Sequence, residues 1–468
     1  MNQSLICERF PERVAVISEN GLEVTYRQLR GEIESVAKYL APRSVIFIQG
    51  ENHFQSLLYY LAALESGVVP LMLSHELSEL RLQELVDTYQ PRYIVRLAER
   101  ELAGFVEKVR HDGYVLLESE RVQSQTIHPE LAFLATTSGT TGSPKLVRYT
   151  RKNLLANAAD IATYLSLDEN ERAILHLPIH YSFGLSIINS HLYVGASIVL
   201  TRKTVMQKEF WDEMRRHRVT SFSGVPFHYE TLVRLKLAEL ALPDLKTFTL
   251  AGGRLSESKM ALFAKQCLDL GLQFWPMYGQ TEASPRISYL EPDFVMAKLG
   301  SIGKAVPSGK LWIRSESGQD ITATGAIGEL VYEGENVCLG YAQTLADLSL
   351  GDEKCGVLFT GDLAKADEEG FFYLQGRIKR FIKVFGKRVS LDHVEQMLVG
   401  MGLQVLVGGT DDKLVVGIVD EGQLDTTTLR KQIAELVHVN FTAITIKPFS
   451  AFPRLENGKV NYQCLLTK

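Results

Sequence analysis

The chain has 468 residues, of which 46% are apolar and 22% are charged, a composition typical of folded globular proteins. This length exceeds what one hydrophobic core usually organises, so two or more domains are expected. The 50 basic and 55 acidic residues leave a net charge of −5, which provides no general attraction to nucleic acid or to an anionic membrane surface.

The cysteines and the N-terminal segment favour a cytoplasmic protein. Five cysteines occur singly and form no CxxC pair, so the sequence predicts neither a disulfide framework nor a zinc site. Residues 1–16 lack the basic and apolar regions of a secretory signal. Glu65 interrupts the apolar stretch 57–73 before it could span a bilayer. We therefore expect a cytoplasmic protein without a membrane segment.

Short β-branched or aromatic runs alternate with helical periodicity along the first 300 or so residues. One expected helix stops at Gly67, and Asn153 could cap the start of another. This alternation predicts an α/β fold with layered, largely parallel sheets. The expected strands are 44–48, 92–95, 114–117, 131–137, 173–178, 196–200, 247–253 and 272–279.

The character of the sequence changes near Gly376. Residues 360–377 are typical of a hairpin, and a cationic stretch follows, with six basic residues between Arg377 and Arg388. The remainder predicts a small α+β unit. We therefore expect a large N-terminal domain, 1–376, and a small mobile C-terminal domain, 377–468. The elements expected after the hairpin are helices at 391–401 and 427–437 and strands at 404–409, 413–419 and 443–449.

The most informative segment is 131–150, where an expected strand leads into a loop rich in Ser, Thr and Gly. Glycines let the backbone approach a ligand closely, and successive amides and hydroxyls offer donors to anionic oxygens. Taken alone, the loop is either a flexible connector or a phosphate binder, and it lacks the Gly-Lys-Ser/Thr of a Walker loop. The candidate phosphate-binding residues are Thr137, Ser138, Gly139, Thr140, Thr141, Gly142 and Lys145.

The run TSGTTGSPK, 137–145, closely resembles the phosphate loop of the AMP-forming adenylation superfamily. That family comprises acyl- and aryl-CoA synthetases, the adenylation domains of nonribosomal peptide synthetases, and beetle luciferases. The resemblance covers essentially the whole chain, because the other motifs of the family follow in order. It implies an ATP-dependent ligase that forms an acyl-AMP.

Two central motifs resemble the nucleotide-binding segments of this family. In MYGQTEAS, 277–284, the resemblance places Tyr278 against adenine, with Gly279 beside it, Thr281 on the α-phosphate and Glu282 on Mg²⁺. A carboxylate beside a polyphosphate needs such a metal to avoid repulsion. In LAGGRL, 250–255, Gly252 and Gly253 are implied to line the adenine and acyl sites, and Arg254 replaces a small residue of the family pattern.

The acyl pocket is placed by the same resemblance. Ser182 stands where amino-acid-activating relatives carry an aspartate that pairs with the α-ammonium group of the substrate. A cation buried without a countercharge is costly, so α-amino acids are disfavoured and an uncharged aryl or modest-sized acyl acid is expected. The residues implied to line the pocket are His180, Tyr181, Ser182, Phe183 and Phe227.

The C-terminal motifs resemble the parts of the family that complete catalysis. Asp362 matches the aspartate that binds the ribose hydroxyls, and Arg377 is expected near the ribose or a phosphate. Lys379 falls at the hinge position. Lys383 lies in an element that faces the site during thiol transfer, and Lys459, in NGKVNY, matches the catalytic lysine.

The resemblance implies a two-step reaction. A substrate carboxylate attacks the α-phosphorus of ATP, and Lys459, Mg²⁺ and Thr281 meet the charge of the transition state. The small domain then swings about its hinge, and the thiol of CoA or of the phosphopantetheine of a separate acyl carrier protein takes the acyl group. CoA is placed slightly ahead as the acceptor.

Three alternatives stay open at this stage. An amino-acid ligase that charges a separate carrier protein would show amino-acid-dependent pyrophosphate exchange. A luciferase-like oxygenase would emit light with a luciferin. An ATP-binding regulator without turnover is the third, although the retention of Lys459, Glu282 and Asp362 argues against it.

Overall fold

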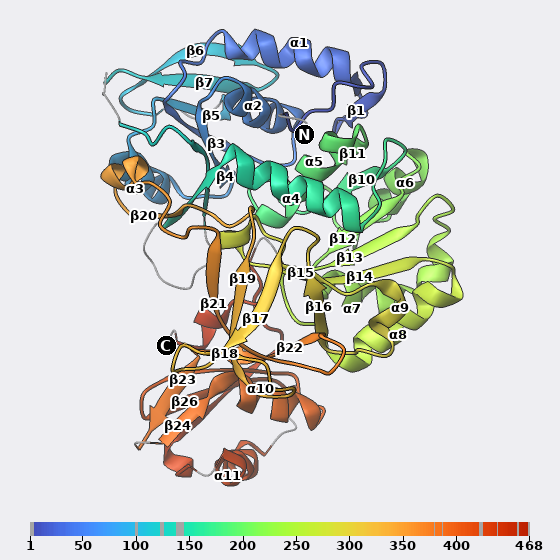
Figure 1. Cartoon of the computed structure of the whole chain (residues 1–468), viewed down its shortest axis with the longest axis vertical. Coiled ribbons are helices and arrows are strands. Elements are labelled where there is room, and N and C mark those ends of the chain that lie inside the picture. Colours follow the sequence, from blue (N-terminus) through green and yellow to red (C-terminus); the bar gives the residue numbers. More distant parts are fainter. Residues whose placement is uncertain are drawn as a thin grey trace. The chain divides into compact units, whose positions relative to one another are not determined.

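The computed structural model describes residues 4–98, 102–121, 126–136, 145–378, 380–385, 387–420, 425–437, 439–455 and 458–466 (Figure 1). The chain divides into two compact units. The first unit comprises residues 1–310 and 332–358, and the second comprises 311–331 and 359–468.

One sheet of the first unit is largely parallel, with the strand order β16-β15-β14-β13-β12-β10-β11-β1-β2. Parallel pairing joins the strands from β14 to β1, whereas β2, β15 and β16 pair antiparallel. All four residues of β13 are buried, as expected for a parallel strand covered on both faces. The strands are β1 (Val14–Ile17), β2 (Glu23–Thr25), β10 (Arg172–Leu175), β11 (Ser197–Leu200), β12 (Ser221–Gly224), β13 (Thr247–Leu250), β14 (Gln273–Tyr278), β15 (Ser288–Tyr289) and β16 (Ser301–Ala305).

A second sheet of the first unit has the order β20-β9-β8-β4-β3-β5-β7-β6, with β3, β4, β5 and β8 parallel. Its strands are β3 (Val45–Gly50), β4 (Val69–Ser74), β5 (Tyr93–Leu97), β6 (Phe105–His111), β7 (Tyr114–Ser119), β8 (Leu131–Thr136), β9 (Leu146–Thr150) and β20 (Gly340–Ala342). Each of the eight strands expected from the sequence is present in these two sheets. The predicted α/β class is therefore confirmed. The first sheet is largely parallel as expected, whereas only the pairs among β3, β4, β5 and β8 are parallel in the second sheet and its other pairs are antiparallel.

Helices connect the parallel strands. The helix α2 is buried along ten successive residues, 55–64. Apolar side chains follow one another from Leu57 to Leu64 and are not confined to one stripe of the helix. The helices of this unit are α1 (Tyr26–Ala37), α2 (Phe54–Glu65), α3 (Glu79–Tyr89), α4 (Arg151–Tyr164), α5 (Ser182–Val194), α6 (Lys208–Arg216), α7 (Pro226–Leu235), α8 (Glu257–Asp269) and the short α9 (Pro292–Val295).

The start of α4 corrects one expectation. Thr150, not Asn153, is the N-cap residue of this helix. Thr150 Oγ1 accepts from the Asn153 N–H at 3.0 Å, and Asn153 Oδ1 accepts from the Thr150 N–H at 2.8 Å. This reciprocal arrangement is a capping box, so Asn153 caps the helix from its third position.

The second unit contains a sheet with the strand order β18-β17-β19-β21-β22, a β23–β24 hairpin and the three-stranded sheet β25-β26-β27. The predicted hairpin at 360–377 is present as the antiparallel pair β21–β22. The elements are β17 (Lys310–Arg314), β18 (Asp320–Ile321), β19 (Gly328–Glu333), β21 (Val357–Ala366), β22 (Phe372–Arg377), β23 (Phe381–Val384), β24 (Lys387–Ser390), α10 (Leu391–Gly400), β25 (Val405–Thr410), β26 (Lys413–Val419), α11 (Thr426–Val437) and β27 (Ile444–Phe449).

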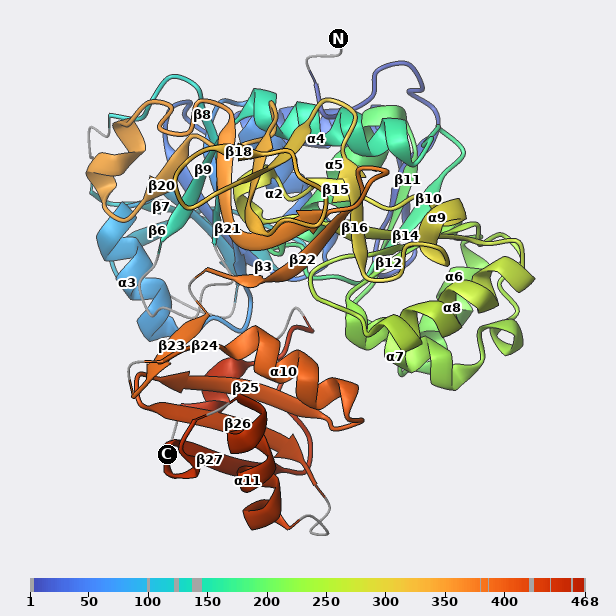
Figure 2. The same ribbon diagram turned by 60° about the horizontal axis from the view of Figure 1, so that its bottom comes forward.

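The core of the small α+β part follows the strand period of two. Val407 and Val416 face α10 and α11 in one apolar cluster, whereas their neighbours Leu406 and Val415 face Leu465 on the other side. Figure 2 shows both helices beside the β25–β26–β27 sheet. The helices and strands expected after residue 390 are all present.

The contact-based division groups 311–331 and 359–376 with the C-terminal residues. The expected domain boundary at Arg377 and the hinge at Lys379 stay predictions, and Lys379 lies outside the described residues. No helix in the described ranges is long and apolar enough to cross a membrane.

Candidate functional site

The motif that follows β14 forms a tight loop. Ala283 N–H donates to the Gln280 carbonyl at 2.9 Å, and Ile287 N–H returns to the Tyr278 carbonyl at 3.0 Å. A Cβ atom on Gly279 would lie 1.6 Å from the carbonyl oxygen of Pro285. Only glycine fits there, so the loop that presents residues 281 and 282 depends on Gly279.

Three neighbours hold the Thr281–Glu282 segment. Tyr149 donates its hydroxyl hydrogen bond to the Thr281 carbonyl, and Cys338 N–H donates to the Glu282 carbonyl at 2.9 Å. The Tyr341 hydroxyl donates to Glu282 Oε1 at 2.8 Å. These bonds fix both the backbone and the carboxylate of the motif, which is what a preorganised electrostatic site requires.

Lys145 lies beside the same group. Its Nζ is 3.1 Å from the centroid of the Tyr341 ring, a cation–π contact. Burial and the adjacent Glu282 carboxylate raise the pKa of Tyr341 well above its ordinary value, so its phenol keeps the proton that it donates. The structure thus brings Lys145 and Glu282 together through Tyr341, a residue that the sequence analysis missed.

Asn336 holds the second half of this loop, residues 283–286. The sequence alone did not identify this residue. This asparagine is fully buried, and its Nδ2 donates to the Ala283 carbonyl at 2.7 Å and to the Arg286 carbonyl at 2.6 Å. Its own carbonyl accepts from Ser284 Oγ at 2.8 Å. The loop therefore has a buried hydrogen-bonded support over its whole length.

The chemistry of Glu282 fits a magnesium ion. The described residues contain no cluster of three or more His, Cys, Asp or Glu side chains that could hold a metal. Magnesium in nucleotide sites is commonly bound by one or two carboxylates together with phosphates and waters. Glu282 supplies one such carboxylate, oriented by Tyr341.

The residues expected to line the acyl pocket lie mostly at the start of α5. Tyr181 is the N-cap residue, and Ser182 and Phe183 form the first turn. Ser182 Oγ lies 3.5 Å from Thr281 Oγ1, which places this turn against the 278–286 loop. Burial raises the pKa of Tyr181 to about 12, so it stays neutral. His180 lies in the preceding turn.

The other predicted lining residues follow the ends of β12 and β13. Phe227 lies on α7, with its ring 5.8 Å from that of His228. Gly252, which follows β13, has a φ of +83°, and a Cβ on Gly253 would lie 3.1 Å from Pro226 Cγ. Both glycines therefore occupy positions where a side chain would be strained or crowded.

Asp362 and Arg377 face each other in the second unit. They are register partners across β21–β22, and Arg377 Nε donates to Asp362 Oδ1 at 2.9 Å. The Asp362 side chain is 5% exposed and that of Arg377 is 62% exposed. The sequence singled out both residues, and the structure pairs them.

The two other candidate lysines also lie in the second unit. Lys383 is an exposed residue of β23, whose backbone N–H donates to Asp411 Oδ1 at 2.9 Å. Lys459 follows Gly458, and its carbonyl accepts from the Leu455 N–H at 2.8 Å. These bonds fix the backbone of each lysine.

A partly buried network surrounds Arg380. Arg380 donates to Asp392 Oδ1 at 2.5 Å and lies 3.5 Å from Glu395 Oε2. Tyr462 donates its hydroxyl to Glu395 Oε1 at 2.6 Å, and its ring centroid is 4.5 Å from the Arg380 guanidinium. One of the six basic residues between 377 and 388 is therefore committed to internal contacts.

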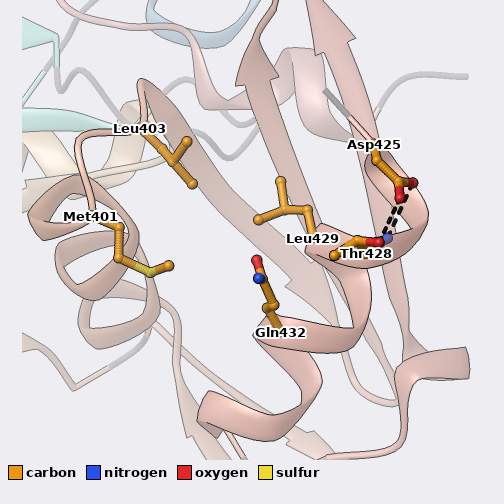
Figure 3. A pocket seen from close by; sticks show the side chains of 6 residues that line it. All are labelled: Met401, Leu403, Asp425, Thr428, Leu429 and Gln432. Atoms are coloured by element: carbon orange, nitrogen blue, oxygen red, sulfur yellow. Dashed lines mark hydrogen bonds between the residues drawn. The ribbon is translucent and has the colours of Figure 1, made fainter. Parts of the chain in front are cut away.

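A pocket of about 220 Å³ lies in the second unit, between the end of α10 and the start of α11. Figure 3 shows Asp425 bonded to Thr428 at its rim. It contains none of the predicted site residues, and we assign it no catalytic role. The lining residues are Met401, Leu403, Asp425, Thr428, Leu429 and Gln432.

The family model described as "AMP-binding enzyme" matches residues 5–342. The chain belongs to the family of AMP-binding enzymes. This membership confirms the family of enzymes expected from the sequence, and the solved structures that resemble the chain confirm the fold class.

Two similar curated proteins are 2-succinylbenzoate–CoA ligases. The chain is 28% identical to the 2-succinylbenzoate–CoA ligase of Bacillus subtilis (strain 168) over 415 residues, 86% of this chain and 83% of that protein. It is 27% identical to the corresponding ligase of Bacillus cereus (strain AH820) over 417 residues, 86% of this chain and 84% of that protein.

Solved structures of AMP-binding enzymes share the fold. The O-succinylbenzoate coenzyme A synthetase of Bacillus subtilis, in complex with AMP, has a TM-score of 0.77 at 23% identity, covering 97% of this chain and 95% of that one. ATP-bound MatB from Rhodopseudomonas palustris has a TM-score of 0.79 at 21% identity, covering 99% and 98%.

Some of the candidate residues lie outside the described ranges. They are Thr137, Ser138, Gly139, Thr140, Thr141, Gly142 and the hinge residue Lys379. The structure describes the flanks of the phosphate loop, where Thr136 of β8 pairs with Leu146 of β9. The roles assigned to these residues stay predictions.

Proposed function

We propose that this AMP-binding enzyme is an acid–CoA ligase that activates an aryl or modest-sized acyl carboxylic acid. The observation that carries the proposal is the preorganised Thr281–Glu282 segment, which Tyr149, Tyr341 and Cys338 hold in place beside Lys145 and the first turn of α5. CoA as the thiol acceptor is supported by similar curated relatives from Bacillus, which are named as CoA ligases.

In the first half-reaction the acid displaces pyrophosphate from the α-phosphorus of ATP. Thr281 would donate to the α-phosphate, and Lys145, with the loop before it, would neutralise the departing phosphates. Glu282 would hold the magnesium ion that accompanies ATP and shields the polyphosphate charge. Each such donor aimed at developing charge contributes about 3–4 kcal/mol of transition-state stabilisation.

The second unit is proposed to supply the remaining groups. Asp362, whose carboxylate is positioned by Arg377, can accept two hydrogen bonds from ribose hydroxyls. Lys459 is assigned to the adenylation step as the cation at the α-phosphate. Lys383, exposed on β23, is assigned to the thiol-transfer step, with Lys379 as the hinge.

An amino-acid ligase is not favoured. An α-ammonium group buried in the acyl site would need a carboxylate partner. The position where amino-acid-activating relatives carry that aspartate is Ser182 in this chain, whose hydroxyl lies beside that of Thr281. The curated relatives are named for an acid without an amino group.

The test is a pyrophosphate-release screen of the purified full-length chain over a library of carboxylic acids, including 2-succinylbenzoate, with amino acids as a comparison set. Acids that score are repeated with CoA and with a holo acyl carrier protein, and the products are identified by mass spectrometry. We expect release with a group of aryl or short acyl acids and an acyl-CoA product. Release with amino acids alone, or transfer to the carrier protein but not to CoA, would contradict the proposal.

A further inference from the structure

Arg286 is a buried cation that forms no ion pair with any residue that the structure describes. It stands four residues after Glu282 in the same loop, and only 3% of it is exposed. Its Nε and Nη1 atoms have no hydrogen-bond partner in the part of the chain that the structure describes. The side chain does form a hydrogen bond with Tyr164, but a neutral phenol does not balance its charge. A guanidinium is always charged, and leaving one buried without a countercharge is costly. Such a site is expected to receive an anion from a ligand.

The guanidinium lies among the side chains assigned to the acyl pocket. Its central carbon is 4.3 Å from the centroid of the Phe183 ring. Its positive charge opposes the rise in pKa that burial causes at Tyr181 and Tyr164. Phe183 and Tyr181 form the start of α5, next to Thr281. Arg286 therefore stands at the acyl end of the candidate site rather than in a separate part of the core.

The backbone of Arg286 is held in this place. Its carbonyl accepts from Asn336 Nδ2 at 2.6 Å, and its N–H donates to the Ala283 carbonyl at 3.0 Å.

A nearby carboxylate, that of Asp160, has other partners. Asp160, whose charge also affects Tyr164, accepts from the Ser308 N–H at 3.0 Å and from Ser308 Oγ at 2.6 Å. Asp160 is thus committed to Ser308 and does not serve as the missing partner.

We propose that Arg286 binds a second, non-reacting carboxylate of the acid substrate, so that the enzyme activates dicarboxylic acids. This inference rests on the proposed function, because it assigns the residue to the acid that is activated. Arginine suits the role, since its planar donors match a carboxylate while its face stacks on an aromatic ring, as on Phe183. The expectation of an uncharged acyl group was based on Ser182 alone. Arg286 changes it, because the acyl group would then carry a second, negatively charged carboxylate.

The acid in the names of the curated relatives is itself a dicarboxylic acid. A 2-succinylbenzoate ion has one carboxylate on its succinyl chain and another on its aromatic ring, and those relatives are named as its CoA ligases. The dicarboxylate class is inferred from the unpaired guanidinium itself, and 2-succinylbenzoate is one member to be tested beside others.

The experiment compares matched pairs of acids that differ by one carboxylate. Suitable pairs are 2-succinylbenzoate with benzoylpropionate, and adipate with hexanoate. The ratio of kcat/KM for pyrophosphate release, dicarboxylate over monocarboxylate, is measured for the wild type, Arg286→Met and Arg286→Lys. Arg27→Met is the matched control, because Arg27 is an exposed arginine paired with Glu12.

We expect the wild type to prefer the dicarboxylate in at least one pair. Arg286→Met should lower that ratio by about 100-fold or more, as when one partner of a desolvated charge pair is removed, mainly through KM. Arg286→Lys should keep part of the preference, and Arg27→Met all of it. A wild type that shows no dicarboxylate preference in any pair, or a preference that survives Arg286→Met, would overturn the inference.

A binding measurement separates this inference from the proposed function. Dicarboxylates should raise the thermal unfolding midpoint of the wild type more than their monocarboxylate partners do, and the difference should vanish in Arg286→Met. If that pattern occurs while no acid releases pyrophosphate, the ligase proposal fails and the carboxylate site stands. If acids react without any dependence on Arg286, the site alone is refuted. Should Arg286→Met not fold, the wild type and Arg286→Lys decide the same question.

Discussion

Lys459 is the residue on which the division between the two half-reactions depends. Lys459→Ala should slow acyl-AMP formation about 100- to 1000-fold, the usual cost of removing one donor to a charged transition state. Transfer from supplied acyl-AMP to CoA should continue at nearly the wild-type rate, because the lysine is assigned to adenylation alone. Rapid-quench assays of each half-reaction measure the two rates, with Lys413→Ala, an exposed lysine of β26, as the control. Equal loss in both half-reactions would refute the assignment.

Tyr341 is predicted to orient the metal-binding carboxylate. Tyr341→Phe removes the hydroxyl that donates to Glu282 at 2.8 Å but keeps the ring that faces Lys145. Loss of such an outer partner typically weakens metal binding roughly 10- to 100-fold. A magnesium titration of pyrophosphate release should therefore show a raised half-saturation concentration. Tyr341→Leu, which also removes the ring, should be worse, and an unchanged magnesium dependence in both variants would count against the role of Glu282.

At the residue scale, the sequence identified the residues of known motifs but not the residues that hold them in place by hydrogen bonds. Glu282 could be predicted because the TE pair recurs in a known motif. Tyr341 and Asn336 could not, since each lies more than 50 residues away and meets the loop only through tertiary folding. Arg286 was visible in the sequence, but its lack of a partner is a property of the packed structure. Hydrogen-bond partners of this kind leave no periodic signal.

At the scale of elements, the network of Arg380, Glu395 and Tyr462 ties α10 to the segment that carries Lys459. Tyr462 lies three residues beyond that lysine and begins the 3₁₀ helix Tyr462–Leu465. Its hydroxyl bonds to Glu395, which also accepts from the Val407 N–H at 2.8 Å. One partly buried carboxylate, that of Glu395, thus joins a helix, a strand and the C-terminal turn.

Tyr462→Phe should destabilise the protein more at high pH than at low pH. Burial raises the pKa of Glu395 above its ordinary value of 4.5, although Arg380 and the Tyr462 hydroxyl pull it down. A carboxyl whose pKa is raised by folding stabilises most below its ordinary pKa, and that contribution is lost as the pH rises through the raised value. Without the hydroxyl the pKa rises further, so the ionised carboxylate at neutral pH loses a charged hydrogen bond.

The measurement is the difference in free energy of unfolding between variant and wild type at pH 4 and pH 8. We expect a loss of about 1–3 kcal/mol at pH 8 and a smaller one at pH 4. The control is Tyr373→Phe, whose hydroxyl bonds to Asp367 at 3.2 Å near the tip of a hairpin. A difference that does not grow with pH would contradict this account of Glu395.

The elements themselves were largely predictable. Buried strands such as 247–250 are continuous apolar runs, and the hairpin 360–377 has a polar turn between two short strands, so local pattern sufficed. The cap of α4 was misplaced by three residues because both members of a capping box are good cap formers. Nothing local distinguishes Thr150 from Asn153.

At the scale of the whole molecule, the sequence placed a boundary by a change in composition, whereas contacts divide the chain differently. Residues 311–331 group with 359–468 because β19 and β21 meet through bonds such as Thr360 Oγ1 to the Leu330 carbonyl at 2.7 Å. Pairing between strands distant in sequence is invisible to composition. A boundary that marks motion need not coincide with one that marks packing, so the predicted hinge near Lys379 is a separate question.

A variant of Lys383 tests the predicted rotation of the C-terminal segment about the hinge near Lys379. If the C-terminal segment serves adenylation in one orientation and thiol transfer in another, the effects of the two lysines must be opposite. Lys383→Ala should leave ATP- and acid-dependent pyrophosphate exchange near the wild-type level, because adenylation does not use this lysine. Transfer of the acyl group to CoA should slow, since Lys383 is exposed on β23 and its charge can meet the phosphates of CoA.

Single-turnover assays on preformed acyl-AMP, at several CoA and salt concentrations, measure this effect. The wild-type KM for CoA should rise with ionic strength, and more steeply than that of Lys383→Ala, because exposed charges are screened. Lys431→Ala is the matched control, an exposed lysine of α11. The alternation would be contradicted if Lys383→Ala lost pyrophosphate exchange as severely as Lys459→Ala, since both lysines would then serve the same half-reaction.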